Sequence, residues 1–462
     1  MADSARLRGG SPASSWIPVL AIAGTAVLVA VLVLLGAVGG PEATGALVVG
    51  PILFAVSLPV FSRQAKLEGD RWIFWVLVLA LLAKFIGSVV RYYVAFDVYG
   101  GIADAAGYHE HGVQIAQNFR IGNFHTGLDS LSDTNFIRFL TGVVYTFVGP
   151  TGLGGFVVFS WLGFWGLFFF YRAFRVAVPE GAHRSYAKLV FFLPTLVFWP
   201  SSIGKEAWMM FALGIAALGA ARILSGRTWR GLVVTALGLW LAAIVRPHVA
   251  GILAVSLAAG YLFRRSRPEL GGFATLAKVV GLTAVTALAV VLVIRADRFL
   301  EQSAIQTEGG VVSVLSQTSE RTGKGGSEFV PSALESPVRA PFAAATVLFR
   351  PFLFEVSNAQ SLAASLETTF LLGLCLIRWR WIGAAILSIR RQPYIAMAIA
   401  YTGLFILAFS GFANFGLLAR ERAQLFPLFL VLLCVPAVIR EVRRRSPSAV
   451  SLEDRGSEPA PR

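Results

Sequence analysis

The densest group of residues able to do chemistry lies between residues 97 and 120, directly after a long apolar run. Asp104, Tyr108 and His111 recur at spacings of four and three residues, which places them on one face of a helix. A carboxylate held just above a bilayer can act as a general base that takes a proton from a sugar hydroxyl. Asp104 is therefore a candidate catalytic residue, although it could also cap a helix that runs from residue 105 to about 120.

The histidines of the same segment, His109 and His111, flank Glu110 and invite comparison with a metal site. Residues two apart on a helix point in different directions, so this spacing argues against a shared ion. We expect both histidines to be solvated side chains at the membrane surface that can contact a substrate. The sequence indicates no cofactor and no metal site, and a requirement for a divalent metal stays open.

A second group lies in the turn from Pro200 to Glu206, between two apolar runs. Pro200 ends one helix, and Glu206 begins the next near the positive end of its dipole. Lys205 at this helix start could meet an anion such as a lipid-linked phosphate in the outer leaflet. The alternative is an ion pair at the membrane surface beside Trp199 as an anchor.

Three arginines and one histidine at the ends of apolar runs complete the candidate substrate-binding residues. Arg246 and His248 flank a proline after one run, and Arg420 and Arg422 come just before another. Ionisable residues at a membrane edge are functional candidates, and the planar guanidinium suits phosphate. Alternatively, Arg246 snorkels to the surface, and Arg420 and Arg422 contact anionic lipid headgroups.

Composition places these residues in a membrane protein. Of 462 residues, 56% are hydrophobic and only 14% are charged, and the mean hydropathy is +0.70. A soluble globular chain is about 25% charged, so a soluble enzyme is nearly excluded. The two cysteines, Cys375 and Cys434, both lie in apolar runs, which excludes a disulfide framework and a cysteine metal site.

Apolar runs long enough to cross about 30 Å of hydrocarbon recur along the whole chain. We therefore expect an all-α polytopic membrane protein with one integral membrane domain over residues 1–440. The composition of residues 441–462 is typical of a disordered basic tail on the cytoplasmic side. The expected transmembrane helices, about twelve in number, cover residues 16–38, 44–62, 72–94, 153–171, 188–200, 206–222, 231–245, 249–263, 274–294, 357–377, 394–411 and 424–440.

The positions of Lys and Arg predict the orientation. Most of them fall in alternate connectors, which places both termini in the cytoplasm and the protein in the plasma membrane. Residues 95–152 and 295–350 are then external loops, and the second could act as a lid or an acceptor-binding loop. The pattern holds only if residues 136–149 form an interfacial helix that does not cross. The net charge of +15 is then a sign of topology and not of nucleic-acid binding.

The first external loop resembles that of GT-C type membrane glycosyltransferases. The likeness rests on Asp-Ala-x-x-Tyr-His from Asp104, Gly-x-x-Ile-Ala from Gly112 and Arg-x-Gly-x-Phe from Arg120, and it extends over about residues 95–175. Enzymes of this type take a sugar from a polyprenyl-linked carrier. The resemblance implies that Asp104 is the catalytic carboxylate, with Asp97 as the second candidate.

The favoured hypothesis is a glycosyltransferase that moves a sugar from a polyprenyl-phosphate-linked donor to an external glycan, lipid or protein acceptor. Lys205, Arg246 and Arg420 or Arg422 would stabilise charge on the leaving phosphate. One alternative is a polysaccharide polymerase or ligase of the O-antigen type, with Arg246 and His248 central.

A second alternative is a transporter or flippase of a lipid-linked or small substrate. It requires broken helices, inverted repeats and ionisable residues near the bilayer midplane. The charged residues lie mainly at the external edge, with Lys84 as the chief exception, and no repeat is evident.

Overall fold

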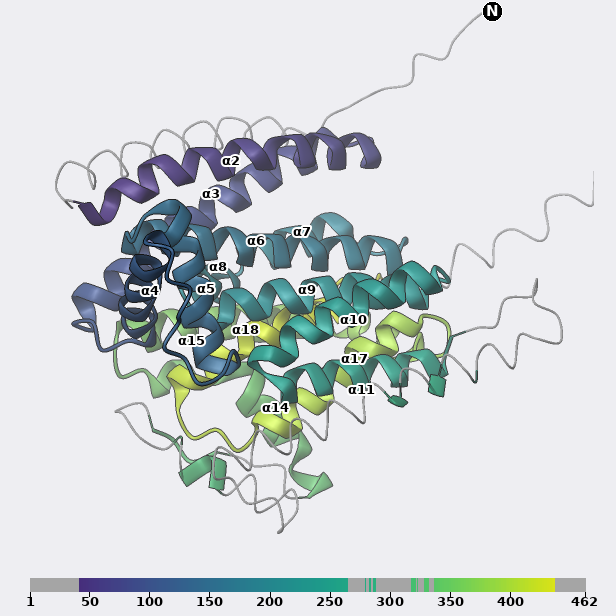
Figure 1. Cartoon of the computed structure of the whole chain (residues 1–462). Helices are drawn as coiled ribbons and strands as arrows, with labels where there is room; N and C mark the ends of the chain where they lie inside the picture. Colours follow the sequence, from purple (N-terminus) through teal and green to yellow (C-terminus); the bar gives the residue numbers. More distant parts are fainter. Residues whose placement is uncertain are drawn as a thin grey trace, which may run out of the picture.

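The computed structural model describes residues 41–264 and 336–436, together with positions 279, 282–283, 286–287, 317–320, 322 and 328–331. Over these residues the regular structure is helical, and one isolated bridge pairs Glu328 with Asn414. The long helices run side by side in a single bundle (Figure 1). The predicted all-α class is therefore confirmed. The expected span 16–38, most of 274–294 and the tail 441–462 lie outside the described residues.

Five helices are long and apolar enough to cross a membrane. They are α2 (Pro41–Glu68), α3 (Arg71–Tyr93), α6 (Gly152–Ala177), α9 (Lys205–Leu224) and α15 (Ala359–Ile377).

Shorter apolar helices lie beside these five: α10 (Thr228–Val245), α11 (Pro247–Leu262), α14 (Ala340–Phe349) and α17 (Pro393–Phe409). The count of about twelve spans is not established, and α14 lies where no span was expected. The remaining elements of this part are α16 (Trp379–Leu387), α18 (Phe415–Leu432), η5 (Pro337–Arg339) and η6 (Leu353–Glu355).

Helix α9 lies at the centre of the bundle because glycines let its neighbours approach closely. A Cβ atom on Gly214 would lie 2.3 Å from the carbonyl oxygen of Gly166 in α6. On the other side, a Cβ on Gly238 of α10 would lie 2.3 Å from the backbone nitrogen of Ala216. Small residues at helix contacts are the usual way in which membrane helices gain packing energy.

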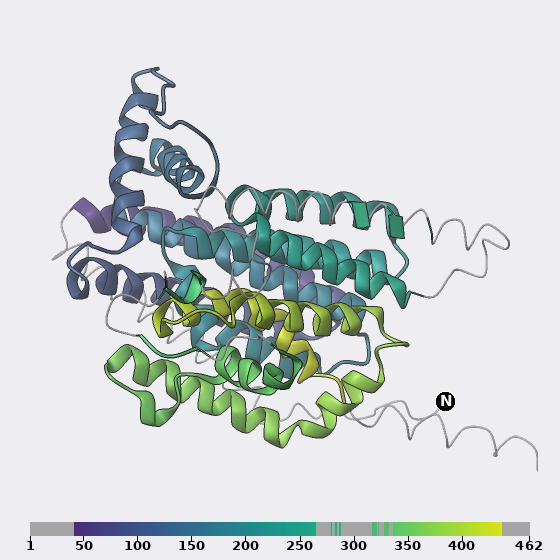
Figure 2. The same ribbon diagram turned by 90° about the horizontal axis from the view of Figure 1, so that it is seen from below.

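Two helices run across the bundle instead of along it. Helices α4 (Asp104–Arg120) and α5 (Asp133–Val148) lie at one end, with their axes crosswise to the long helices in both views (Figures 1 and 2). They pack closely, since a Cβ on Gly112 would come within 2.5 Å of the Thr141 side chain. The helix expected at 136–149 is present as α5, and it is not among the candidate spans.

The expected span 188–200 is not one helix. It is divided into α7 (His183–Phe192), α8 (Pro194–Phe198) and the 3₁₀ turn η3 (Trp199–Ser201). The break falls at Leu193, whose backbone is extended at φ −62° and ψ 125°. A proline disfavours the helical conformation of the residue before it, so Pro194 explains the break. This part of the prediction was wrong because the apolar run concealed the effect of that proline.

Buried charges from two other helices hold the short helix α8. At its start, the Glu367 carboxylate accepts hydrogen bonds from the Thr195 backbone nitrogen at 3.0 Å and hydroxyl at 2.7 Å. At its end, Lys84 Nζ donates to the Pro200 carbonyl at 2.8 Å and to two other carbonyls at 3.3 Å. A negative charge at the first turn and a positive charge at the last both complement the helix dipole.

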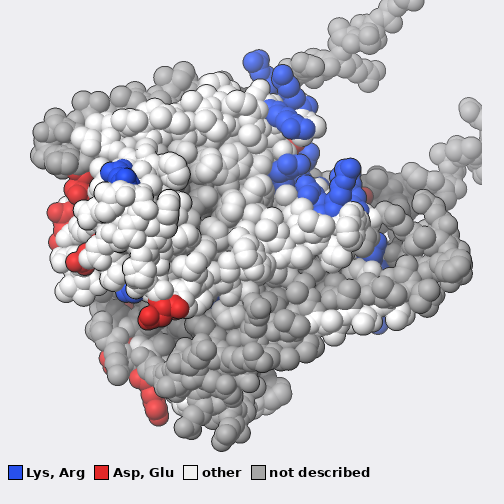
Figure 3. All heavy atoms as spheres, viewed as in Figure 1, with Lys and Arg blue, Asp and Glu red and all other residues white. Residues whose placement is uncertain are grey.

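Charged side chains divide between the two ends of the bundle. Figure 3 shows most of the visible Lys and Arg at the end where α2, α6 and α9 finish, and most of the visible Asp and Glu at the opposite end, where isolated basic side chains also lie. The basic end includes Lys66, Arg71, Arg175 and Arg222, each in or next to the terminal turn of a long helix. Helices α4 and α5 belong to the acidic end.

The glycine contact between α6 and α9 generates a stability prediction. Gly214→Ala should lower the free energy of unfolding by about 1–3 kcal/mol, because the new methyl group meets backbone atoms that cannot rotate away. Gly403→Ala in α17 is the matched control, since nothing lies within 4 Å of its Cβ position. That control should be neutral or stabilising by up to about 1 kcal/mol. Unfolding in detergent measures both, and equal effects would contradict the packing argument.

Candidate functional site

A chain of ion pairs joins five charged residues at the acidic end of the bundle. Arg420 Nη1 donates to Asp104 at 2.7 Å, and Arg420 Nε donates to Glu206 at 2.6 Å. Arg246 Nη2 donates to the same Glu206 oxygen at 3.0 Å. Arg246 Nη1 donates to Glu421 at 2.5 Å. Candidate residues separated by more than three hundred positions thus meet at one place.

Each member of this chain of ion pairs lies at the start of a helix or near a break in one. Asp104 is the first residue of α4, and Glu206 is the second residue of α9. Arg246 occupies the break between α10 and α11, where its backbone leaves the helical region at φ −138° and ψ 81°. Arg420 and Glu421 lie in the second turn of α18. Because these residues lie near helix starts at the same end of the bundle, their side chains can reach one another.

Burial increases along the chain of ion pairs. The Asp104 side chain is 61% exposed, whereas Glu206 is only 3% exposed. Glu421 and Arg246 are also buried, and Gln424 Nε2 donates to Glu421 at 2.7 Å. Buried charges persist only when they are paired and hydrogen bonded. The chain of ion pairs therefore connects the accessible carboxylate of Asp104 to buried, mutually paired charges.

The helix that carries Asp104 has the predicted extent, but Asp104 does not cap it. The N-cap position belongs to Ala103, and no side-chain capping bond is present there. Asp104 occupies the first helical position instead, from which its carboxylate reaches Arg420. Asp97, the second catalytic candidate, lies in the π-helical turn η2 (Val94–Val98) and is exposed.

Tyr108 and His109, two further candidates on α4, lie in different environments. Tyr108 is buried, and burial together with the nearby charges of Asp104 and Glu206 raises its pKa, so its hydroxyl stays protonated. His109 Nδ1 lies 2.7 Å from the Tyr145 hydroxyl, and burial lowers the pKa of this histidine.

His111 turns away from His109. Its Nδ1 lies 2.8 Å from the Gly107 carbonyl oxygen of its own helix. The two histidines therefore point apart, as their spacing predicted. No group of three or more His, Cys, Asp or Glu residues suited to a metal ion occurs in the described part of the chain.

Lys205 and Arg422 are engaged in different ways. Lys205 Nζ lies 2.6 Å from Asp133, the first residue of α5, so this pair ties α5 to the start of α9. Asp133 has a positive φ of 51°, an unfavourable conformation for a residue other than glycine, which the pair helps to hold. Arg422 donates to the Leu348 carbonyl near the end of α14 at 3.2 Å and to the carbonyl of Arg350, the residue that follows this helix, at 2.5 Å.

His248 lies in the first turn of α11, two residues after Arg246. Its ring centroid is 6.3 Å from that of Phe409. It therefore belongs to the contact of α11 with α17.

Sequence reasoning missed one buried cation beside the site. Arg91, in the last turn of α3, is 8% exposed, and its guanidinium lies 4.8 Å from the Phe198 ring centroid and 4.9 Å from that of Trp199. Its Nε is buried without a hydrogen-bond partner, and the described residues offer it no ion pair. A single arginine near the end of an apolar run was the available signal.

No family model, curated protein or solved structure matches the chain. The class of protein therefore has to be inferred from the helices of the structure alone. Over the described residues it is a helical membrane protein with five helices long and apolar enough to cross a membrane, and with a chain of ion pairs at one end.

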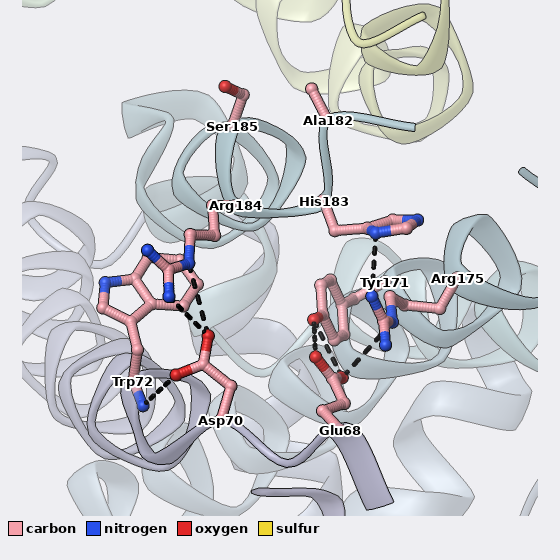
Figure 4. A pocket seen from close by; sticks show the side chains of 9 residues that line it. All are labelled: Glu68, Asp70, Trp72, Tyr171, Arg175, Ala182, His183, Arg184 and Ser185. Carbon is pink, nitrogen blue, oxygen red and sulfur yellow. Dashed lines mark hydrogen bonds and ion pairs between the residues drawn. The ribbon is translucent and has the colours of Figure 1, made fainter. Parts of the chain in front are cut away.

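A cavity of about 360 Å³ lies at the opposite, basic end (Figure 4). On one wall, Arg184 Nη2 donates to Asp70 at 2.7 Å. On the other, Tyr171 donates to Glu68 at 2.8 Å, and Arg175 Nη1 lies 2.8 Å from His183 Nδ1. These contacts bind the start of α7 to the α2–α3 turn and the end of α6.

The contacts of His183 fix its tautomer. Its Nε2 faces the Val178 carbonyl oxygen at 2.8 Å and therefore carries the proton, while Nδ1 accepts from Arg175. Burial is the largest cause that lowers the pKa of His183, and the charge of Arg175 lowers it further. The folded state thus prefers neutral His183.

Loss of the central carboxylate should be costly. Glu206→Gln leaves Arg246 and Arg420 with reduced compensation, and we expect the free energy of unfolding to fall by about 3 kcal/mol. Glu110→Gln, at an exposed position on α4, is the control and should stay within about 0.5 kcal/mol of the wild type. Denaturant unfolding in detergent measures the difference. Equal stability of the two variants would mean that the ion pairs contribute little.

The tautomer of His183 generates a pH prediction. Because its pKa is lower in the folded state than the usual 6.5, the unfolded chain binds more protons as pH falls through that value. The wild type should therefore lose more thermal stability between pH 7.5 and 5.5 than His183→Gln does.

Melting temperatures at both pH values test this prediction. His125→Gln, in the exposed loop between α4 and α5, is the control for the amide and should keep the wild-type pH dependence. Identical pH profiles for the wild type and His183→Gln would rule out His183 as the group responsible.

Proposed function

We propose that the protein is a membrane glycosyltransferase that takes a sugar from a polyprenyl-phosphate-linked donor and passes it to an external glycan, lipid or protein acceptor. The observation that carries this proposal is the meeting of Asp104, Glu206, Arg246 and Arg420 in one chain of ion pairs. Residue type and place in the sequence alone make these four residues candidates. A transferase of this kind needs an accessible carboxylate and fixed cations at one membrane edge.

In the proposed reaction, Asp104 takes the proton of the acceptor hydroxyl as its oxygen attacks the anomeric carbon. A bond forms between that oxygen and the sugar, and the bond from the sugar to the carrier phosphate breaks. The electron pair leaves with the phosphate, whose negative charge the arginines stabilise. Exposure of the Asp104 side chain supports this role because the acceptor must reach it from water.

The division of charge between the two ends supports an orientation. Basic connectors favour the cytoplasmic side, so the end with Lys66, Arg71 and Arg222 would face the cytoplasm of a cell with this protein in its plasma membrane. The acidic end, with α4 and α5, would then be external. Crosswise helices at that end suit a position along the membrane surface.

The polymerase or ligase alternative would make Arg246 and His248 central. Both terminal nitrogens of Arg246 are already bonded to carboxylates, which suits a structural role better than contact with a substrate. His248 packs against Phe409 of α17. The geometry therefore favours the transferase with an aspartate base.

One observation favours the transporter alternative. The broken helix around α8, with Lys84 and Glu367 at its ends, is the kind of interrupted helix found in transporters. Both charges, however, are engaged at the two ends of α8. We therefore keep transport as the second candidate.

A substitution at Asp104 tests the proposal. Asp104→Asn removes the base while keeping the shape, and transfer of sugar from a polyprenyl-phosphate-linked donor in a reconstituted membrane should fall at least about 100-fold. Asp129→Asn, an exposed aspartate of the same loop, is the matched control and should keep wild-type activity.

The same assay separates the alternatives. Comparison of lipid-linked intermediates and envelope glycans in cells that express each variant gives a second readout. Unchanged glycans with Asp104→Asn would contradict the proposed base, and uptake of substrate without sugar transfer would favour the transporter.

A further inference from the structure

The outermost contact in the chain of ion pairs differs from the others. The pair between Arg420 and Asp104 has one partner that is 61% exposed, whereas both pairs of Arg246 join buried side chains. Exposed ion pairs contribute little free energy, so a competing anion can replace one of their members at small cost. Arg420 would remain in place during such an exchange because its Nε stays bonded to buried Glu206 at 2.6 Å.

A second cation, Arg91, is close enough to this contact to interact with its charges. Arg91 is 8% exposed and lacks an ion pair among the described residues, and the charges of Asp104, Glu206 and Arg420 act on it. The rings of Phe198 and Trp199 hold its guanidinium by their faces. A buried cation whose printed partners in the described part of the chain are aromatic rings is costly unless an anion joins it for part of the time.

From these observations we infer that a phosphate group on a membrane lipid binds between Arg91 and Arg420 and displaces Asp104 from Arg420. The inference rests on the proposed function and deepens it. Binding of the donor would free the Asp104 carboxylate from its cation only when a substrate is present. Arg420 thus serves two anions in turn, the carboxylate in the empty site and the phosphate in the loaded one.

Charge balance supports an exchange rather than simple addition. Asp104, Glu206 and Glu421 face Arg246 and Arg420, and Arg91 brings the number of cations to that of the carboxylates. An added phosphate would leave the buried centre negative if Asp104 stayed in contact. Release of Asp104 toward water removes that excess, since its side chain already lies at the surface.

Binding of farnesyl phosphate to the purified protein in phosphatidylcholine nanodiscs tests the inference. Farnesol is the uncharged probe, and inorganic phosphate and phosphatidylglycerol separate a prenyl phosphate from a free anion and from an ordinary lipid headgroup. Asp104→Asn should bind farnesyl phosphate about threefold more tightly, because the competing carboxylate is gone. Arg91→Gln should bind it about tenfold more weakly.

Two further variants serve as controls. Arg184→Gln, at the opposite end of the bundle, should leave every affinity unchanged. Arg91→Lys keeps the charge and should fall between the wild type and Arg91→Gln. Equal farnesol binding in all variants shows that they are folded, so a change confined to the phosphate probe reports on the proposed site.

The outcomes separate this inference from the proposed function. If Asp104→Asn abolishes transfer but binds farnesyl phosphate no more tightly, the transferase proposal stands and the exchange is wrong. If the same variant binds more tightly yet transfers normally, the exchange stands and the catalytic base is wrong. Unchanged binding by Arg91→Gln would overturn the phosphate site, as would tighter binding of phosphatidylglycerol than of farnesyl phosphate.

Discussion

The burial of Glu206 is the constraint on which the acidic end of the molecule depends. A carboxylate removed from water is tolerated only with cations and hydrogen bonds close by. Arg246 and Arg420 meet this need, and both bond to the same oxygen. Arg246 can do so only because the chain breaks between α10 and α11, and Arg420 only because α18 passes beside the start of α9. Three helices, α9, α11 and α18, are thus tied together at one buried carboxylate.

The break before α9 is supported from elsewhere in the bundle. Glu367 and Lys84 bond to backbone groups at the two ends of α8. These side-chain bonds replace backbone hydrogen bonds that a continuous helix would have made. The turn that follows then delivers Glu206 to the ion pairs, while Arg91 packs on its aromatic residues. A charged residue within a span therefore serves here to fix a broken helix and, through it, the site.

The sequence predicted the all-α class, and several of the residues that it singled out meet in the chain of ion pairs. Apolar length predicted the long helices, and residue type at the ends of apolar runs singled out Glu206, Arg246 and Arg420. Pairing between distant segments has no local signal, so neither the shared oxygen of Glu206 nor the partner of Lys205 could be predicted. Arg91 was missed for the same reason, because its environment comes from a turn a hundred residues away.

The position of Asp104 illustrates why local rules and function can diverge at one residue. Sequence preference favours aspartate as an N-cap, a role that would have used its carboxylate on the backbone of α4. Ala103 takes the cap position instead, without a side-chain bond, so the helix gives up a stabilising contact. The carboxylate that is spared faces water on one side and an arginine on the other. The loss of a capping bond at such a position is expected where the side chain has a role outside its own helix.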